Sequence, residues 1–181
     1  MKSRSRAIHR WEIAGTIFII LVGSVLHFVF GWTGGWRPVA VIAAVNESIW
    51  EHLKLAFWPG LFWALLPLKG VELPLLERLA AKGFTLFLTA VLIVTIFASY
   101  TTILGHNLLL LDIGTFVLAV VIGQCVSAAI GIYGMPGSAP FLLGLSLLIA
   151  QFTAYAFLTY YPPDLWLFVD SRNDLRGIPL I

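Results

Sequence analysis

The sequence predicts an all-α, polytopic membrane protein, a bundle of five transmembrane helices with its N-terminus inside and its C-terminus outside. Of its 181 residues, 60% are hydrophobic and only 11% are charged, whereas a soluble domain carries about 25% charged residues. The mean hydropathy is +0.95. The apolar residues form five runs, each long enough to cross about 30 Å of hydrocarbon as a helix. We therefore treat residues 1–181 as a single transmembrane domain.

The five expected helices follow the apolar runs in order: 11–32, 47–68, 83–104, 110–132 and 140–160, with an extracytoplasmic tail at 161–181. The first run is longer than the apolar stretch of a signal peptide, and no small-residue cleavage site follows it. We expect it to be retained as a helix, with Trp32 at its interfacial end. The fifth helix ends before Pro162 and Pro163, because proline cannot continue it.

Basic residues near the helix ends predict the orientation. With the N-terminus inside, the inner segments hold Lys2, Arg4, Arg6, Arg10, Lys69, Arg78 and Lys82, whereas the outer segments hold Arg37, Arg172 and Arg176. Lysine and arginine accumulate on the cytoplasmic side of membrane proteins. The excess therefore places the N-terminus inside, and we expect the protein in a cell membrane, the inner membrane of a bacterium.

The composition also excludes several classes of protein. Eleven basic and nine acidic residues give a net charge of only +2, with no basic patch to bind nucleic acid. The single cysteine, Cys125, excludes an intramolecular disulfide framework and a zinc site built mainly from cysteine. Membrane lipids are the expected partners, and a homodimer is left open.

Ionisable residues gather at the outer ends of the expected helices. Each costs about 2.5–3.5 kcal/mol at the centre of a membrane helix, so such residues are rare there and usually functional. The inner ends show nothing comparable in the sequence. We therefore expect one shared polar site at the outer ends of helices one to four, drawn from His27, Asn46, Glu47, Ser48, Glu51, His52, Lys54, Tyr100, His106 and Asp112.

The start of the second helix carries most of these residues. At 100° per residue, Glu47, Glu51 and Lys54 share one stripe, and Ser48 and His52 lie on the adjoining stripe. Together they form a polar face of about 160°. Such a face must point toward protein or water rather than lipid.

Plainer interpretations of the same residues remain open. Asn46 would cap the second helix, and Glu47 would then favour the helix N-terminus through the macrodipole. Glu51 and Lys54 would form an ordinary ion pair three residues apart. Asp112 would cap the fourth helix. Each interpretation explains its own residues, but none explains why histidines and acids gather at one depth.

The segment Val45–Lys54 resembles a family of small bacterial membrane proteins that is catalogued as a domain of unknown function. Its pattern joins an H-F-x-x-x-W element, the element V-N-E-S-x-W-E-H-L-K and a C-terminal Y-x-P-P segment. Here these read His27-Phe28 with Trp32, then 45–54, then 160–163. The resemblance spans nearly the whole chain and implies no activity.

A shorter segment, Ser48-Ile-Trp-Glu-His-Leu53, is similar to the second-helix motif of progestin and adiponectin receptors and alkaline ceramidases. In that superfamily of membrane hydrolases, the histidine of this helix helps to bind zinc. The resemblance implies that His52 is a metal ligand and that Ser48 assists the bound water or an oxyanion. That superfamily has seven helices and a late H-x-x-x-H pair. Because this chain lacks both, the missing ligands would have to come from His27 and His106.

The residue types themselves support a metal hydrolase as one hypothesis. Zinc takes four ligands, commonly histidine nitrogens and carboxylate oxygens, and a catalytic site keeps one position for water. Metal-bound water near neutral pKa hydrolyses esters and amides, and a site facing the outer leaflet would suit a lipid or another lipophilic substrate. In this hypothesis the metal ligands are His27, His52, His106 and Asp112, and the catalytic groups are Glu47, Glu51 and Ser48.

Two other classes of function remain open. Acids and histidines in membranes often carry protons or coupling ions, and Gln124 and Gln151 would extend such a path inward. The path then meets helix halves that are almost wholly apolar, which counts against a full transport route. The polar residues would otherwise form a structural clasp between helix ends, or a binding site for a lipid headgroup or partner helix.

Overall fold

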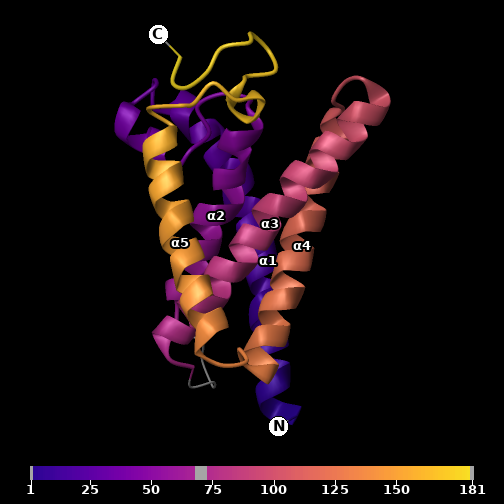
Figure 1. The fold of residues 1–181 in the computed structure, drawn as a ribbon, viewed down its shortest axis with the longest axis vertical. Coiled ribbons are helices and arrows are strands. Elements are labelled where there is room, and N and C mark those ends of the chain that lie inside the picture. The colour runs from indigo at the N-terminus through magenta and orange to yellow at the C-terminus, as the bar shows by residue number, and fades with distance from the viewer. Residues whose placement is uncertain (1, 68–72, 180–181) are drawn as a thin grey trace.

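The computed structural model describes residues 2–67 and 73–179, and its helices run along one long axis with the two ends of the chain at opposite ends of the bundle (Figure 1). The five long helices are α1 (Lys2–Trp32), α2 (Ile49–Leu65), α3 (Leu75–Leu104), α4 (Leu109–Tyr133) and α5 (Ser138–Leu158). Two short 3-10 helices, η1 (Arg37–Val41) and η2 (Trp166–Phe168), complete the order. In these ranges the only β-pairing is an isolated bridge between Val169 and Arg176.

Four of these helices, α1, α3, α4 and α5, are long and apolar enough to cross a membrane. The predicted all-helical, multi-pass membrane class is therefore confirmed at this level. The second predicted helix is shorter than expected, since α2 has 17 residues and is about 25 Å long at 1.5 Å per residue. Its predicted end at Leu68, and the neighbouring Lys69, lie outside the described residues.

Two helices begin well before their apolar runs. The first extends back to Lys2 and the third to Leu75, because the segment before each run, which carries charged residues, continues the same helix. Lys82 therefore lies inside α3 rather than in an inner loop, where the orientation count had placed it. Hydropathy marks the apolar part of a helix and not its polar extension.

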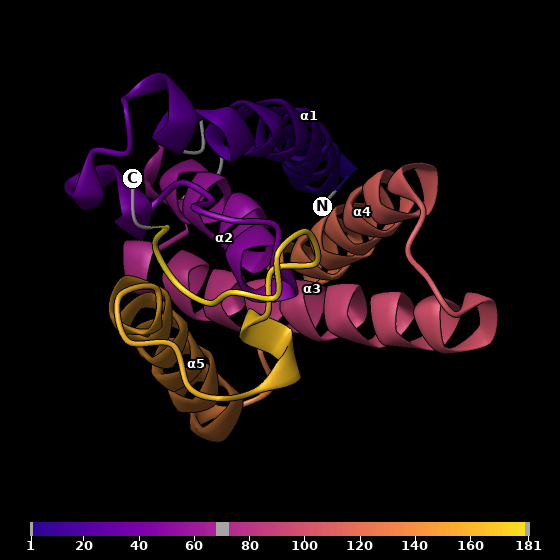
Figure 2. The same cartoon turned by 90° about the horizontal axis from the view of Figure 1, so that it is seen from above.

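The helices pack around two close neighbours in the middle of the bundle, α2 and α3. Contacts join α3 to α2, α4 and α5, and join α1 to α2 and α4; Figure 2 shows this arrangement from above. The backbones of α3 and α5 touch at Gly83 and Gly144. A Cβ atom on Gly83 would lie 2.0 Å from the Gly144 carbonyl oxygen, so any larger residue there would force these helices apart.

The core surrounds α2. Leu53, Phe57 and Trp58 of α2 are buried together with Ile19 of α1 and Leu86 of α3. An α-helix enclosed in this way needs no apolar stripe, because nearly all of its sides face protein. This packing fixes the first turn of α2 beside the last turns of α1.

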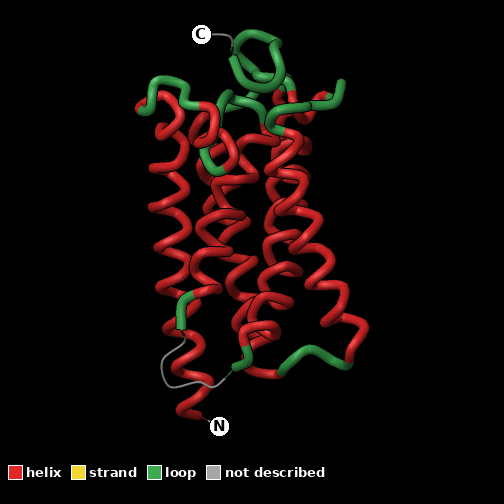
Figure 3. Tube along the Cα trace, turned by 90° about the vertical axis from the view of Figure 1, so that its left-hand side faces the viewer, coloured by secondary structure: helices red, strands yellow, loops and turns green. Residues whose placement is uncertain are grey.

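The connection between α1 and α2 folds back over the same end of the bundle. Ala40, Ala43 and Val45 are buried against Phe30, and the Tyr160 hydroxyl donates a hydrogen bond of 2.6 Å to the Arg37 carbonyl. Figure 3 shows this connection and the C-terminal segment gathered at the end opposite the N-terminus. Both segments therefore surround the beginning of α2.

Candidate metal centre

The start of α2 differs from the prediction by two residues. Ser48, not Asn46, is the N-cap, and its Oγ accepts a hydrogen bond from the Glu51 backbone N–H. Asn46 lies two residues earlier, where its Oδ1 accepts from the Ser48 N–H at 2.9 Å. Asparagine favours such turns because its side chain reaches the backbone two residues on. Glu47 therefore precedes the helix, and the predicted shared stripe of Glu47 and Glu51 is wrong.

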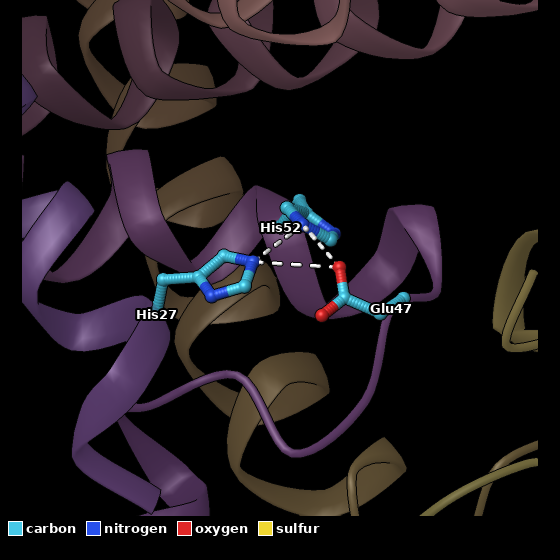
Figure 4. A group of neighbouring side chains, drawn as sticks. All are labelled: His27, Glu47 and His52. Carbon is cyan, nitrogen blue, oxygen red and sulfur yellow. Dashed lines mark hydrogen bonds and ion pairs between the residues drawn. The ribbon is translucent and has the colours of Figure 1, made fainter. Parts of the chain in front are cut away.

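Freed from the helix, Glu47 points toward two histidines. His27 comes from the last turns of α1 and His52 from the first turns of α2, and the three side chains converge in Figure 4. The two histidine Nε2 atoms are 3.1 Å apart. Oε2 of Glu47 lies 3.5 Å from Nε2 of His27 and 3.6 Å from Nε2 of His52. These three atoms satisfy the spacing of a metal-binding group.

The spacing matches one face of a tetrahedron around a metal. With zinc–nitrogen and zinc–oxygen bonds of about 2.0–2.1 Å, neighbouring ligand atoms lie about 3.3 Å apart. The observed separations of 3.1, 3.5 and 3.6 Å scatter around that value. The three atoms are therefore spaced as three ligands of one tetrahedral ion would be.

The ring of His52 is already oriented for such a role. Its Nδ1–H donates to the Ser48 carbonyl oxygen at 2.7 Å. In a neutral imidazole this leaves the lone pair on Nε2, the atom that faces His27 and Glu47. A backbone carbonyl on the far nitrogen is a frequent outer-shell partner of metal-ligating histidine. Ser48 therefore positions His52 through its carbonyl, while its hydroxyl caps the helix.

The site is partly open and contains a negative charge. The side chains of His27, Glu47 and His52 keep 25%, 22% and 32% of their exposure. Oε1 of Glu47, the oxygen facing away from the histidines, lies 3.1 Å from Arg172 Nη2. The His27 ring holds the pKa of the Glu47 carboxyl below its usual value against the opposing effect of partial burial, and the positive charge of Arg172 acts in the same direction. The carboxylate is therefore ionised and available to a cation.

Glu51 and Lys54 form a separate, fully buried network. Lys54 Nζ lies 2.6 Å from Glu51 Oε2 and donates to the Ala40 carbonyl and to Thr159 Oγ1. Glu51 also accepts from the Val45 N–H and from the Thr159 hydroxyl. The carboxylate of Glu51 is thus occupied by three donors from within the fold.

The structure does not bring the residues of the α3–α4 connection into the site. Figure 1 shows α3 and α4 leaning away together toward this connection. His106 is exposed there, and its Nδ1 contacts the Leu104 carbonyl. Asp112 accepts from Tyr100 and from Asn107. Leu108, not Asp112, occupies the N-cap position of α4. The predicted polar site therefore separates into three groups.

A further polar cluster lies at the N-terminal end of the bundle, where the sequence showed nothing comparable to the outer end. Glu12 of α1 and Lys82 of α3 are paired at 2.7 Å. Gln124 of α4 accepts from Lys82 at 2.7 Å, and Ser127 donates to Glu12 at 3.0 Å. The expectation of an apolar inner half is therefore wrong, and Gln124 belongs to this cluster rather than to a path from the outer end.

One signal could have revealed this cluster in the sequence. Glu12 and Lys82 carry opposite charges at the inner edges of two apolar runs, and Gln124 and Ser127 lie three residues apart on a third. Residues three apart share a helix face, so their polar groups point the same way. Arg172, the cation beside Glu47, gave no such signal, because it lies in a segment without periodicity.

Together the fold and the site define an all-helical protein of the multi-pass membrane class, with a two-histidine, one-glutamate group at one end of the bundle. The chain belongs to a family of unknown function, DUF6512, which matches residues 1–178. This match confirms the resemblance to an uncharacterised family. No curated protein and no solved structure matches the chain.

Proposed function

We propose that this protein binds a divalent transition metal, zinc by preference, through His27, Glu47 and His52. The observation that carries the proposal is the convergence of two imidazole Nε2 atoms and one carboxylate oxygen within 3.6 Å of one another. Two histidines and a glutamate are one of the ligand sets that zinc enzymes use, and the fourth position is then open to water.

The proposed reaction is hydrolysis of an ester or amide in a lipid or another lipophilic substrate. Zinc lowers the pKa of its bound water to about 7, which supplies hydroxide at neutral pH. The site supports access from outside, because all three ligands keep some exposure. Arg172 lies beside the ligand Glu47 and would attract the negative charge that develops on a substrate oxygen.

The orientation of the helices decides on which side of the membrane the metal site lies. We propose that α2 crosses together with the four longer helices, enclosed by α1 and α3, with the N-terminus in the cytoplasm of a bacterial cell. The basic residues Lys2, Arg4, Arg6 and Arg10 at the N-terminal end favour this orientation. The metal site then lies at the outer surface of the cell membrane.

The remaining predicted site residues take other roles in the proposal. Glu51 and Lys54 support the structural-clasp interpretation, because their polar atoms bind one another, the α1–α2 connection and Thr159. Ser48 is a positioning residue, since its carbonyl orients His52. His106 and Asp112 have no part in the proposed coordination.

The test is metal-dependent hydrolysis by the full chain in detergent. The purified protein is stripped with a chelator, reloaded with zinc and assayed against fluorogenic lipid esters and amides of different chain length. We expect turnover that requires zinc and is lost in His52→Ala, with His106→Ala matching the wild type as the control. Turnover that survives chelation, or that His106→Ala abolishes equally, would contradict the proposal. Zinc binding without turnover on any of these substrates would contradict the hydrolytic step.

A further inference from the structure

A cavity of about 580 Å³ lies at the N-terminal end of the bundle, opposite the proposed metal site. Its walls come mainly from α1, α3, α4, the α4–α5 connection and the start of α5, and its polar lining includes Glu12, Lys82 and Ser127 of the polar cluster at this end. A volume of this size is typical of a small-molecule site. The unused polar groups of its lining decide which class of ligand would bind there.

The floor of the cavity offers an unused hydrogen-bond donor beside a paired carboxylate. An ammonium group has three N–H donors, and in the described part of the chain Lys82 Nζ has two acceptors, Glu12 and Gln124. Each oxygen of Glu12 already accepts one hydrogen bond, since Oε2 binds Lys82 and Oε1 binds the Ser127 hydroxyl. A ligand that accepts a hydrogen bond would therefore use the remaining N–H donor of Lys82.

Arginine side chains at the rim add further positively charged hydrogen-bond donors. Arg78 lines the cavity and donates one guanidinium N–H to the Leu66 carbonyl. Its buried Nε has no hydrogen-bond partner among the described residues. Arg4 also lines the rim, and Glu77 is the one rim carboxylate in the described lining. Because Glu12 and Lys82 neutralise each other, the remaining charge is positive.

The rest of the lining is largely apolar, and includes Ile8 and Trp11 of α1 and Phe141 of α5. A cavity with cationic donors at its floor and rim, and apolar walls between membrane-class helices, fits an amphiphile with an anionic head. Basic pockets between transmembrane helices bind anionic headgroups in this way, and guanidinium groups are well matched to phosphate oxygens.

We propose that this cavity binds the phosphate headgroup of an anionic membrane lipid. Lys82 donates to a phosphate oxygen from the floor, Arg78 and Arg4 neutralise its charge from the rim, and the apolar walls contact the glycerol and upper acyl chain. The site is independent of the proposed metal centre, since it shares none of its residues and lies at the other end of the bundle.

The experiment measures lipid retained by the purified full chain. The protein is equilibrated with phosphatidylcholine vesicles containing phosphatidylglycerol as the minor component, extracted into mild detergent and examined by native mass spectrometry. We expect one phosphatidylglycerol per wild-type chain, and about tenfold weaker retention in the Arg4→Gln/Arg78→Gln variant, which loses two charge-assisted contacts. Arg4→Gln alone, an exposed residue at the rim, gives a partial loss and keeps the test usable if the double variant fails to fold.

The matched control is Arg6→Gln/Arg10→Gln, which removes the same charge from the same end of α1. Both residues are exposed and neither lines the cavity, so retention should match the wild type. Equal loss in the two double variants would overturn the proposal, because it would indicate general attraction to a basic surface. Stabilisation by inorganic phosphate without retained phosphatidylglycerol would also overturn it, in favour of a soluble phosphate ester.

Discussion

Two buried lysine–glutamate pairs lie at opposite ends of this bundle, and they differ in how completely their polar atoms are used. In the first pair, Lys54 donates to Glu51, to the Ala40 carbonyl and to Thr159, so all three ammonium donors have acceptors. In the second, Lys82 donates to Glu12 and Gln124 beside a cavity of about 580 Å³.

The difference separates a structural pair from a binding pair that has the same chemistry. Burying an ion pair costs free energy. The attraction between the two charges offsets that cost only when hydrogen bonds also satisfy their remaining donors and acceptors. The Lys54 network meets that condition within the fold and joins η1, α2 and the end of α5. The Lys82 network leaves one donor for a ligand. Whether all three ammonium donors have acceptors is thus more informative about the role of a buried pair than the presence of the pair itself.

The largest effect is expected from breaking the saturated pair. Lys54→Met leaves the Glu51 carboxylate buried without its cation, and loss of one partner of a buried pair costs about 3–5 kcal/mol. The measurement is the free energy of unfolding in mixed detergent micelles. A Glu51→Gln/Lys54→Met double variant carries no charge and should lose much less. A double variant as unstable as the single one would show that charge is not the cause.

A smaller effect is expected from the corresponding change in the open pair. Lys82→Met leaves Glu12 bonded to Ser127 and bordering a cavity, and the Glu12 side chain keeps 12% of its exposure. Water can then solvate the carboxylate, so we expect a loss of about 1–3 kcal/mol in the same unfolding measurement. A loss greater than that of Lys54→Met would reverse the comparison between the two pairs.

The sequence predicted the helices well, because each helix of a membrane-class protein contains a long run of apolar residues. Five apolar runs correspond to α1–α5, and their bounds miss mainly where polar residues extend a helix, as from Lys2 to Arg10. Hydropathy cannot detect such extensions, because they lack the signal on which it depends. The interpretation of Glu51 and Lys54 as an ion pair is also confirmed.

The site was harder to predict, because its geometry depends on where one helix begins. Moving the N-cap from Asn46 to Ser48 takes Glu47 off the helix and turns its carboxylate toward His27 and His52. His106 matched these histidines in estimated depth, but depth carries no information on lateral position. Only the packing of α3 and α4 shows that their connection leans away.

The central claim is that His27, Glu47 and His52 form one metal site, and its most direct test is metal content. Wild type, His52→Ala and His106→Ala are purified in mild detergent and their metals quantified by mass spectrometry. We predict one zinc per chain in wild type and in His106→Ala. In His52→Ala we expect a larger loss of zinc affinity than the about 10–100-fold seen when only a hydrogen-bond partner of a ligand is removed. A folded wild type without stoichiometric metal, or equal loss of metal in both variants, would contradict the account.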